Sequence, residues 1–86
     1  SIERLELSDC GLTDWPQGVA NLNNLKTLKL HKNKIRQIPF EIGKLTQLEI
    51  LIMSKNQLEK VSPEIQHCSQ MKELSLNDNE FLKMLP

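Results

Sequence analysis

A pattern of apolar residues that repeats every 23 positions constrains the fold of this chain more than any other feature. The stretch 25–45 shows one complete unit. Residues 28–30 alternate as a β-strand does, and Ile38, Ile42 and Leu45 follow at the steps of a helical turn. One short unit therefore contains a strand, a turn and a helix-like return. Such a unit buries only part of its apolar surface and needs neighbours of the same kind.

The unit recurs along the whole chain, with predicted repeats at 1–24, 25–47, 48–70 and an incomplete 71–86. Positions one, four, six and eleven are apolar in every copy, and position nine is Asn or Cys. These five columns are Ile2, Leu25, Leu48 and Met71; Leu5, Leu28, Leu51 and Leu74; Leu7, Leu30, Met53 and Leu76; Leu12, Ile35, Leu58 and Phe81; and Cys10, Asn33, Asn56 and Asn79. We expect a single domain of about four stacked repeats, forming a segment of a longer protein.

The columns match the L-x-x-L-x-L-x-x-N/C-x-L signature of a leucine-rich repeat. The run 38–51, I-P-F-E-I-G-K-L-T-Q-L-E-I-L, resembles the 23-residue class found in Ras-pathway scaffolds of the Shoc/Sur type, erbin/densin scaffolds, plant Ras-group-related proteins and many ciliary proteins. The resemblance implies a cytoplasmic, intracellular protein that binds other proteins, often on a concave sheet. The expected fold is an α/β solenoid, with a curved parallel sheet of about four strands on the concave side and short helical or 3₁₀ turns on the convex side.

Prolines mark the return leg of each repeat. They stand at the fifteenth or sixteenth position, as Pro16, Pro39, Pro63 and Pro86. Proline suits the first turn of a helix, and Ser62 is a candidate N-cap. We predict a turn or two of 3₁₀ or α-helix near 16–22, 39–45 and 63–68. Trp15 stands where later repeats have Ile38, Val61 and Met84. It is expected to fill core volume near one end, and the alternative is a role in stacking against a ligand.

The ninth column predicts a ladder of polar side chains. The chain turns there and leaves backbone groups without a sheet partner, and an Asn side chain supplies both a donor and an acceptor. Asn33, Asn56 and Asn79 are expected to link neighbouring turns, whereas Cys10 donates only weakly. Two repeats separate Cys10 from Cys68, about 10 Å along the stack, so a disulfide is not expected. We predict two free, largely buried thiols, which fits a reducing compartment.

The candidate binding surface is the set of strand and turn side chains that point away from the core, which we call the concave face. The residues expected to contact a partner are Thr27, Lys29, His31, Lys32, Ile50, Ile52, Lys55, Glu73 and Ser75. Ile50 and Ile52 place two large apolar side chains among polar ones, which favours a binding site. The alternative is a third strand covered by an arm from elsewhere in the parent protein.

A band of positive charge adjoins the two isoleucines. Residues 26–36 contain five Lys or Arg side chains and no acid, while acidic residues flank the band on both sides. One interpretation is that the band steers the acidic rim of a partner, whose apolar centre then meets the isoleucines. The other is a solvated face of exposed ion pairs, Glu6–Lys29, Asp9–Lys32 and Lys55–Asp78, each worth about 0–1 kcal/mol.

Composition and motifs disfavour several functions. Equal numbers of basic and acidic side chains, 11 of each, argue against a nucleic-acid or membrane-surface binder, and no apolar run is long enough to span a bilayer. No metal-ligand spacing or phosphate-binding loop indicates a cofactor. His31 can be drawn beside Asp9, Ser8 and Ser54 as a hydrolase-like trio, and His67 beside Cys68 as a thiol–imidazole pair. An open sheet, however, supplies no oxyanion site.

We therefore predict a protein–protein interaction module or signalling scaffold that is not itself an enzyme. Two alternatives stay open. One is a regulatory or targeting domain of a larger enzyme, such as a kinase, a ubiquitin ligase or a phosphatase. The other is an architectural subunit of a ciliary or cytoskeletal assembly. The repeat pattern alone does not distinguish them, because one fold serves many functions.

Overall fold

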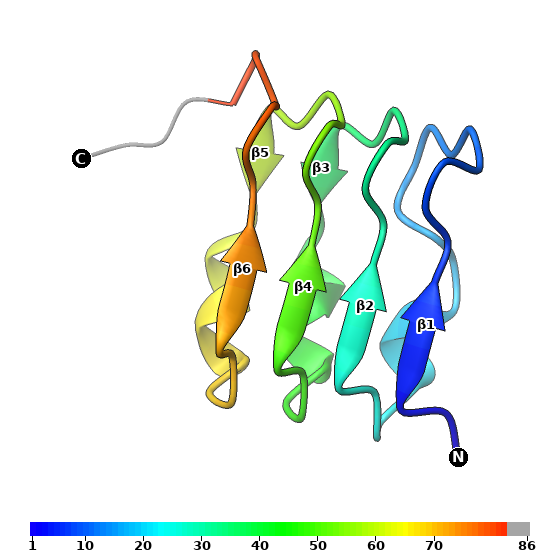
Figure 1. Ribbon diagram of the computed structural model, residues 1–86. Helices are drawn as coiled ribbons and strands as arrows, with labels where there is room; N and C mark the ends of the chain where they lie inside the picture. Colours follow the sequence, from blue (N-terminus) through cyan, green and yellow to red (C-terminus); the bar gives the residue numbers. More distant parts are fainter. Residues whose placement is uncertain (83–86) are drawn as a thin grey trace.

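The computed structural model describes residues 1–82, which stack as successive repeats around one core (Figure 1). Strands β1 (Arg4–Glu6), β2 (Thr27–Lys29), β4 (Ile50–Ile52) and β6 (Glu73–Ser75) form a parallel sheet in the order β1-β2-β4-β6. The register aligns residues that are one repeat apart, which confirms the predicted fold. Residues 83–86 lie outside the described part of the chain. They contain Met84, Pro86 and the end of the predicted fourth repeat.

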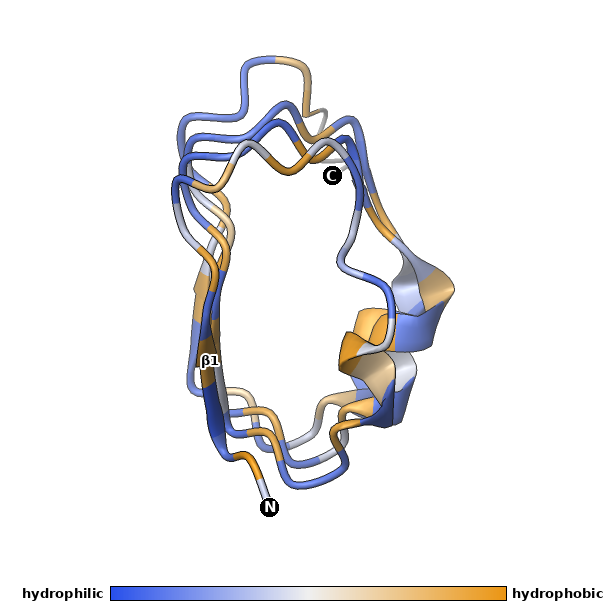
Figure 2. Cartoon of the chain, turned by 90° about the vertical axis from the view of Figure 1, so that its right-hand side faces the viewer, coloured by the Kyte–Doolittle hydropathy of each residue, from blue (hydrophilic) through white to orange (hydrophobic). Residues whose placement is uncertain are grey.

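The return legs run opposite the sheet, as Figure 2 shows from the end of the stack. They contain three 3₁₀ turns, η1 (Val19–Asn21), η2 (Phe40–Lys44) and η3 (Pro63–His67), and residues 1–82 include no α-helix. The first turn is shorter than the predicted 16–22 because Gly18, at φ 89°, directly precedes it. Ser62 is the predicted N-cap of η3, and its side chain accepts a hydrogen bond from the Glu64 N–H over 3.2 Å.

A second, two-stranded parallel sheet was not predicted. Strands β3 (Gln37–Ile38) and β5 (Lys60–Val61) pair on the return legs of the second and third repeats. Their residues alternate between exposed side chains and side chains that pack on the core. The pairing therefore links these two legs behind the main sheet, where β3 and β5 lie side by side in Figure 1.

The core lies between the sheet and the return legs. Leu28, Leu51 and Ile42 are completely buried, as the predicted inward columns require. Trp15 packs against this core as predicted, and its indole Nε1 is buried without a hydrogen-bond acceptor among residues 1–82. The outer repeats cover the same columns less well, and Leu74 remains 42% exposed.

The asparagine ladder is confirmed. Asn33, Asn56 and Asn79 are all buried, and each side chain bonds to backbone groups of its own repeat and of the preceding one. The Asn33 Oδ1, for example, accepts hydrogen bonds from the N–H groups of Cys10 and Leu12.

The prediction for the thiols is half right. Cys10 and Cys68 are both free, and Cys68 is buried. Cys10, however, is exposed, because the side chains of its column pack against the preceding repeat, and within residues 1–82 no repeat is stacked before the first. Its Sγ donates only to the Ser8 carbonyl, over 3.4 Å.

Candidate functional site

Alternation along the strands positions the predicted partner-binding residues on one surface. In the sheet, Ile50 lies between Thr27 and Glu73, and in a second row Ile52 lies between Lys29 and Ser75. Adjacent strands are about 4.8 Å apart, so the side chains within each row are immediate neighbours. The structure therefore brings together the strand residues that the sequence proposed for the concave face.

Ile50 and Ile52 differ from the residue between them. Leu51 is completely buried, whereas both isoleucines are partly exposed and lie outside the hydrophobic core cluster. Their side chains therefore lie outside the apolar core that joins the repeats. A pair of apolar side chains among Thr27, Lys29 and polar residues of β6 is the kind of surface that another protein covers.

The turn after each strand has one unusual backbone conformation in all four repeats. Asp9, Lys32, Lys55 and Asp78 have positive φ, between 56° and 60°. The Lys32 N–H donates to the Ser54 carbonyl over 3.1 Å, and the Lys55 N–H makes the same bond to Asn77. This shared geometry sets Lys32 and Lys55 at equivalent places on the rim of the face. Sequence reasoning missed it because lysine is not a typical residue of left-handed turns.

The three ion pairs proposed for the basic band are not formed. Within residues 1–82 the salt bridges are Arg4–Glu6, Lys26–Glu3, His67–Glu64 and Lys72–Glu49. The predicted pairs Glu6–Lys29, Asp9–Lys32 and Lys55–Asp78 are absent from this set. Glu6 instead accepts a bond from Arg4 within its own strand, at 3.0 Å, and Lys26 of the band pairs with Glu3 of the preceding repeat.

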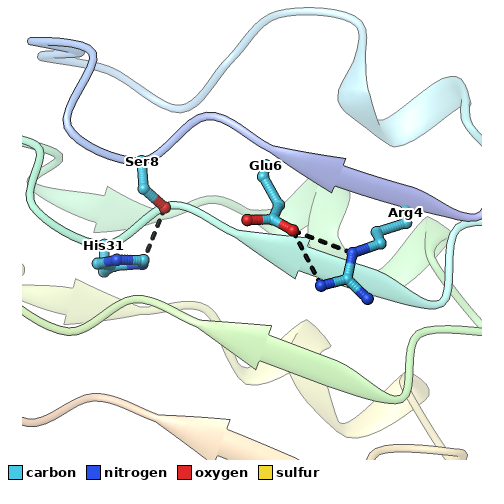
Figure 3. Close-up of polar contacts among 4 residues, drawn as sticks. All are labelled: Arg4, Glu6, Ser8 and His31. Atoms are coloured by element: carbon cyan, nitrogen blue, oxygen red, sulfur yellow. Dashed lines mark hydrogen bonds and ion pairs between the residues drawn. The ribbon is translucent and has the colours of Figure 1, made fainter.

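The Arg4–Glu6 pair lies on β1, the edge strand of the sheet (Figure 3). The hydrogen bond from the Arg4 guanidinium holds the pKa of Glu6 below its usual value, and positive charge on Lys29 and His31 acts in the same direction. Glu6 is therefore ionised at neutral pH and is engaged by Arg4. Lys29, Lys32 and Lys55 make no ion pair within the described residues, which leaves their charges available to a partner.

The hydrolase-like trio is only partly assembled. The Ser8 Oγ lies 2.8 Å from the His31 Nδ1, a hydrogen bond between the first two repeats (Figure 3). No carboxylate within residues 1–82 hydrogen-bonds to His31, so Asp9 does not complete a triad. The second pair is also not formed, since His67 faces Glu64 at 3.5 Å. Burial raises the pKa of the Cys68 thiol, whose Sγ donates to the Ile42 carbonyl.

Two features on the convex side were not predicted. Phe40, in η2, is 71% exposed, and an open groove of about 410 Å³ lies close by, with Pro39 and Glu41 among its lining residues. The sequence held one signal for Phe40: the equivalent positions of the first and third repeats are Gln17 and Pro63, so an aromatic side chain there is unusual. The groove had no sequence signal.

The parallel sheet, the asparagine ladder and the short return turns define a repeat solenoid. A leucine-rich-repeat family model matches residues 1–58 of the 86, and the chain belongs to this family. Repeats of the family generally mediate protein–protein interaction and are typically not catalytic. A search of curated proteins gave no match to this chain. Over residues 1–82, the structure includes no helix with the length and apolar character needed to cross a bilayer.

Proposed function

We propose that this chain is a protein-interaction module whose concave face binds a partner protein through Ile50 and Ile52. One observation carries the proposal: these two side chains are apolar and partly exposed, yet they lie outside the core cluster. Binding energy at protein interfaces concentrates in a few such residues near the centre of the contact. The family to which the chain belongs supports a protein as the ligand.

The charges around the isoleucines suggest the chemistry of the partner. Lys29 adjoins Ile52 in its row, and Lys32 and Lys55 stand on the rim without ion pairs among the described residues. On the other side Glu73 adjoins Ile50. The proposed partner therefore has an apolar centre and an acidic rim that faces the lysines. Such charges contribute mainly to the association rate and to specificity, and less to affinity.

The remaining parts of the proposal concern the setting of the chain. A scaffold or signalling role in the cytoplasm is supported by the resemblance of the run 38–51 to intracellular scaffolds of the Shoc/Sur and erbin/densin types. The two free cysteines support a reducing compartment. A regulatory domain of a larger enzyme would use the same face. The proposed contact therefore does not depend on whether the chain is part of a scaffold or of an enzyme.

A second candidate is the architectural subunit, and the exposure of Phe40 favours it. An assembly that surrounds the solenoid would cover the convex side as well as the concave face. The two candidates therefore differ in which apolar residues a partner needs: Ile50 and Ile52 in the first, Phe40 also in the second.

The test compares capture of partner proteins by the chain, by an Ile50→Ser/Ile52→Ser variant and by Phe40→Ser as a matched apolar-to-polar control on the convex side. All three should show the same circular dichroism spectrum, because none of the replaced side chains is in the core cluster. We expect the double variant to lose its partner by about 30-fold or more in Kd, and the control to keep it. Equal binding by the double variant and the unaltered chain would contradict the proposal.

A further inference from the structure

The return leg of the first repeat does not join the sheet formed by the next two. β3 and β5 pair, and the Glu59 N–H donates to the Arg36 carbonyl over 2.7 Å. By contrast, no backbone hydrogen bond links residues 13–18 to residues 35–40. The last bond between these legs runs from the Lys34 N–H to the Leu12 carbonyl. The convex side therefore has a break between the first and second repeats.

Local sequence explains the break. Trp15 occupies the position that Ile38 and Val61 hold in the paired legs, and its larger side chain packs against the core. In the paired legs the Ser62 N–H donates to the Ile38 carbonyl, but at the equivalent place in the second leg Pro39 has no N–H to donate to Trp15. Gly18, at φ 89°, precedes the 3₁₀ turn that begins at Val19. The first leg is thus kept from continuing the ladder beside β3.

An open groove of about 410 Å³ occupies this break. Its charged and aromatic lining comes from three successive legs: Asp14 and Trp15, Arg36 and Glu41, and Glu59 and Lys60. None of the five charged side chains forms an ion pair within residues 1–82. The groove therefore contains unpaired charges of both signs beside the ring of the chain's single tryptophan.

The charges do not balance. The lining has three acidic side chains, Asp14, Glu41 and Glu59, and two basic ones, Arg36 and Lys60, so its formal charge is −1. Lys60 belongs to the third leg. Asp14 precedes Trp15 directly, and Glu41 lines the same groove from the second leg. A groove whose lining has an excess of carboxylates and an aromatic ring suits a cationic side chain.

The neighbouring surface shows what kind of molecule would bring that cation. Phe40, between Pro39 and Glu41 of the groove, is 71% exposed. An exposed phenyl ring next to a site for a cation calls for a ligand with an apolar group beside its charge. A segment of a protein, in which a basic residue adjoins an apolar one, meets both requirements.

We propose that this groove is a second protein-binding site, which takes an arginine or lysine side chain of a partner segment. The Trp15 ring forms one wall, the carboxylates of Asp14 and Glu41 bind the cationic group, and an adjacent apolar residue of the partner packs on Phe40. Arginine is the preferred residue, because its planar guanidinium both stacks on aromatic rings and bonds to carboxylates. The site lies on the return legs, and it does not depend on the concave face.

The single tryptophan makes the groove directly observable, because its fluorescence reports only on Trp15. The probes are the peptide acetyl-Gly-Arg-Leu-amide and its counterpart with citrulline, which has nearly the shape of arginine without the charge. We expect a saturable change in fluorescence with the arginine peptide, and at least about fivefold weaker binding of the citrulline peptide. Identical titration curves for the two peptides would overturn the proposal.

Variants localise the effect. Asp14→Asn/Glu41→Gln should abolish the preference for arginine, whereas Glu73→Gln, an acidic residue of the concave face, should keep it. Phe40→Ser should weaken binding of the leucine peptide, with no effect on acetyl-Gly-Arg-Gly-amide. Ile50→Ser/Ile52→Ser should leave every curve unchanged, which separates this site from the concave face. A preference for arginine that survives Asp14→Asn/Glu41→Gln would place the cation elsewhere and refute the assignment.

Discussion

The inner and outer repeats of this protein carry equivalent residues in equivalent columns, yet they bury them to different extents. Leu28 and Leu51, in the second and third repeats, have no exposed surface. Leu74, the same residue in the same column of the fourth repeat, is 42% exposed, and Leu5 in the first is only partly buried. Since every repeat is covered by its neighbours, the column determines the direction of a side chain and the neighbours determine its burial.

The two outer repeats also differ from each other. The asparagine side chains reach towards the preceding repeat, so Asn79 in the fourth repeat makes the full set of bonds and is buried. Cys10, in the first repeat, has no such repeat beside it and is exposed. The apolar columns therefore lose burial in both outer repeats, whereas the polar column loses it only in the first. The stack is directional.

The largest expected effect separates an inner from an outer leucine. Leu51→Ala should lower the free energy of unfolding by about 2–5 kcal/mol, because it leaves a cavity between two covering repeats. Leu74→Ala removes the same atoms from a half-exposed position and should cost less than about 1 kcal/mol. Urea denaturation followed by circular dichroism measures both values.

The milder pair Leu51→Val and Leu74→Val serves as the control if Leu51→Ala does not fold. Leu51→Val should again lower the free energy of unfolding more than Leu74→Val does. Equal losses at the two positions would mean that burial in the inner repeats adds nothing to stability, and the comparison between repeats would then fail.

A smaller effect tests the direction of the ladder. Asn56→Ala leaves the Ile35 N–H without a partner, whereas the Leu30 carbonyl keeps its bond from Asn33. Asn79→Ala leaves two N–H groups unpaired, those of Asn56 and Leu58. Each unpaired buried group costs about 1–3 kcal/mol. Replacement of the outer asparagine should therefore cost at least as much as replacement of the inner one, which is the reverse of the order expected for the two leucines.

Two control variants sharpen this test. Asn77→Ala changes an exposed asparagine next to the ladder and should alter stability by less than about 0.5 kcal/mol. Cys10→Asn restores the ladder residue in the first repeat, where the groups of a preceding repeat are absent, and should gain equally little. A large gain from Cys10→Asn would contradict the directional ladder.

The sequence predicted those parts of the fold that follow from periodicity. The five columns, the parallel register and the capping role of Ser62 come from spacing and from the chemistry of single residues, and all are confirmed. The exposure of Cys10 was predicted wrongly because a prediction from the position in the repeat assumes a neighbouring repeat on both sides. The proposed ion pairs failed for another reason: Glu6 pairs with Arg4 of its own strand, and the position of a residue in the repeat does not determine which partner a long exposed side chain takes.

Of the two candidate sites, the concave face could be predicted from the sequence and the groove could not. The rows that contain Ile50 and Ile52 follow directly from the alternation of a strand, so the sequence placed these residues on one face. The groove beside Trp15 lies where the return legs of the first and second repeats do not pair through their backbones. No single residue type in the sequence predicts that this pairing is absent. Features made by regular repetition are visible in a sequence, whereas features made by its local interruption need the structure.

The smallest expected effect concerns pH and compares the two thiols. Burial raises the pKa of Cys68 above the ordinary value of 9.0, so the folded chain favours the neutral thiol. The stability that this preference contributes is fully present below pH 9.0 and is lost as the pH rises through the raised pKa of the folded state. The free energy of unfolding should therefore fall as the pH rises above 9.0. The free energy of unfolding of Cys68→Ala should fall less steeply with pH, whereas that of Cys10→Ala, which removes an exposed thiol, should follow the unaltered chain.

Parallel curves of unfolding free energy against pH for all three proteins would contradict this prediction. They would show that the Cys68 thiol ionises as easily in the folded as in the unfolded state, and that the inner repeats do not exclude water from the third return leg.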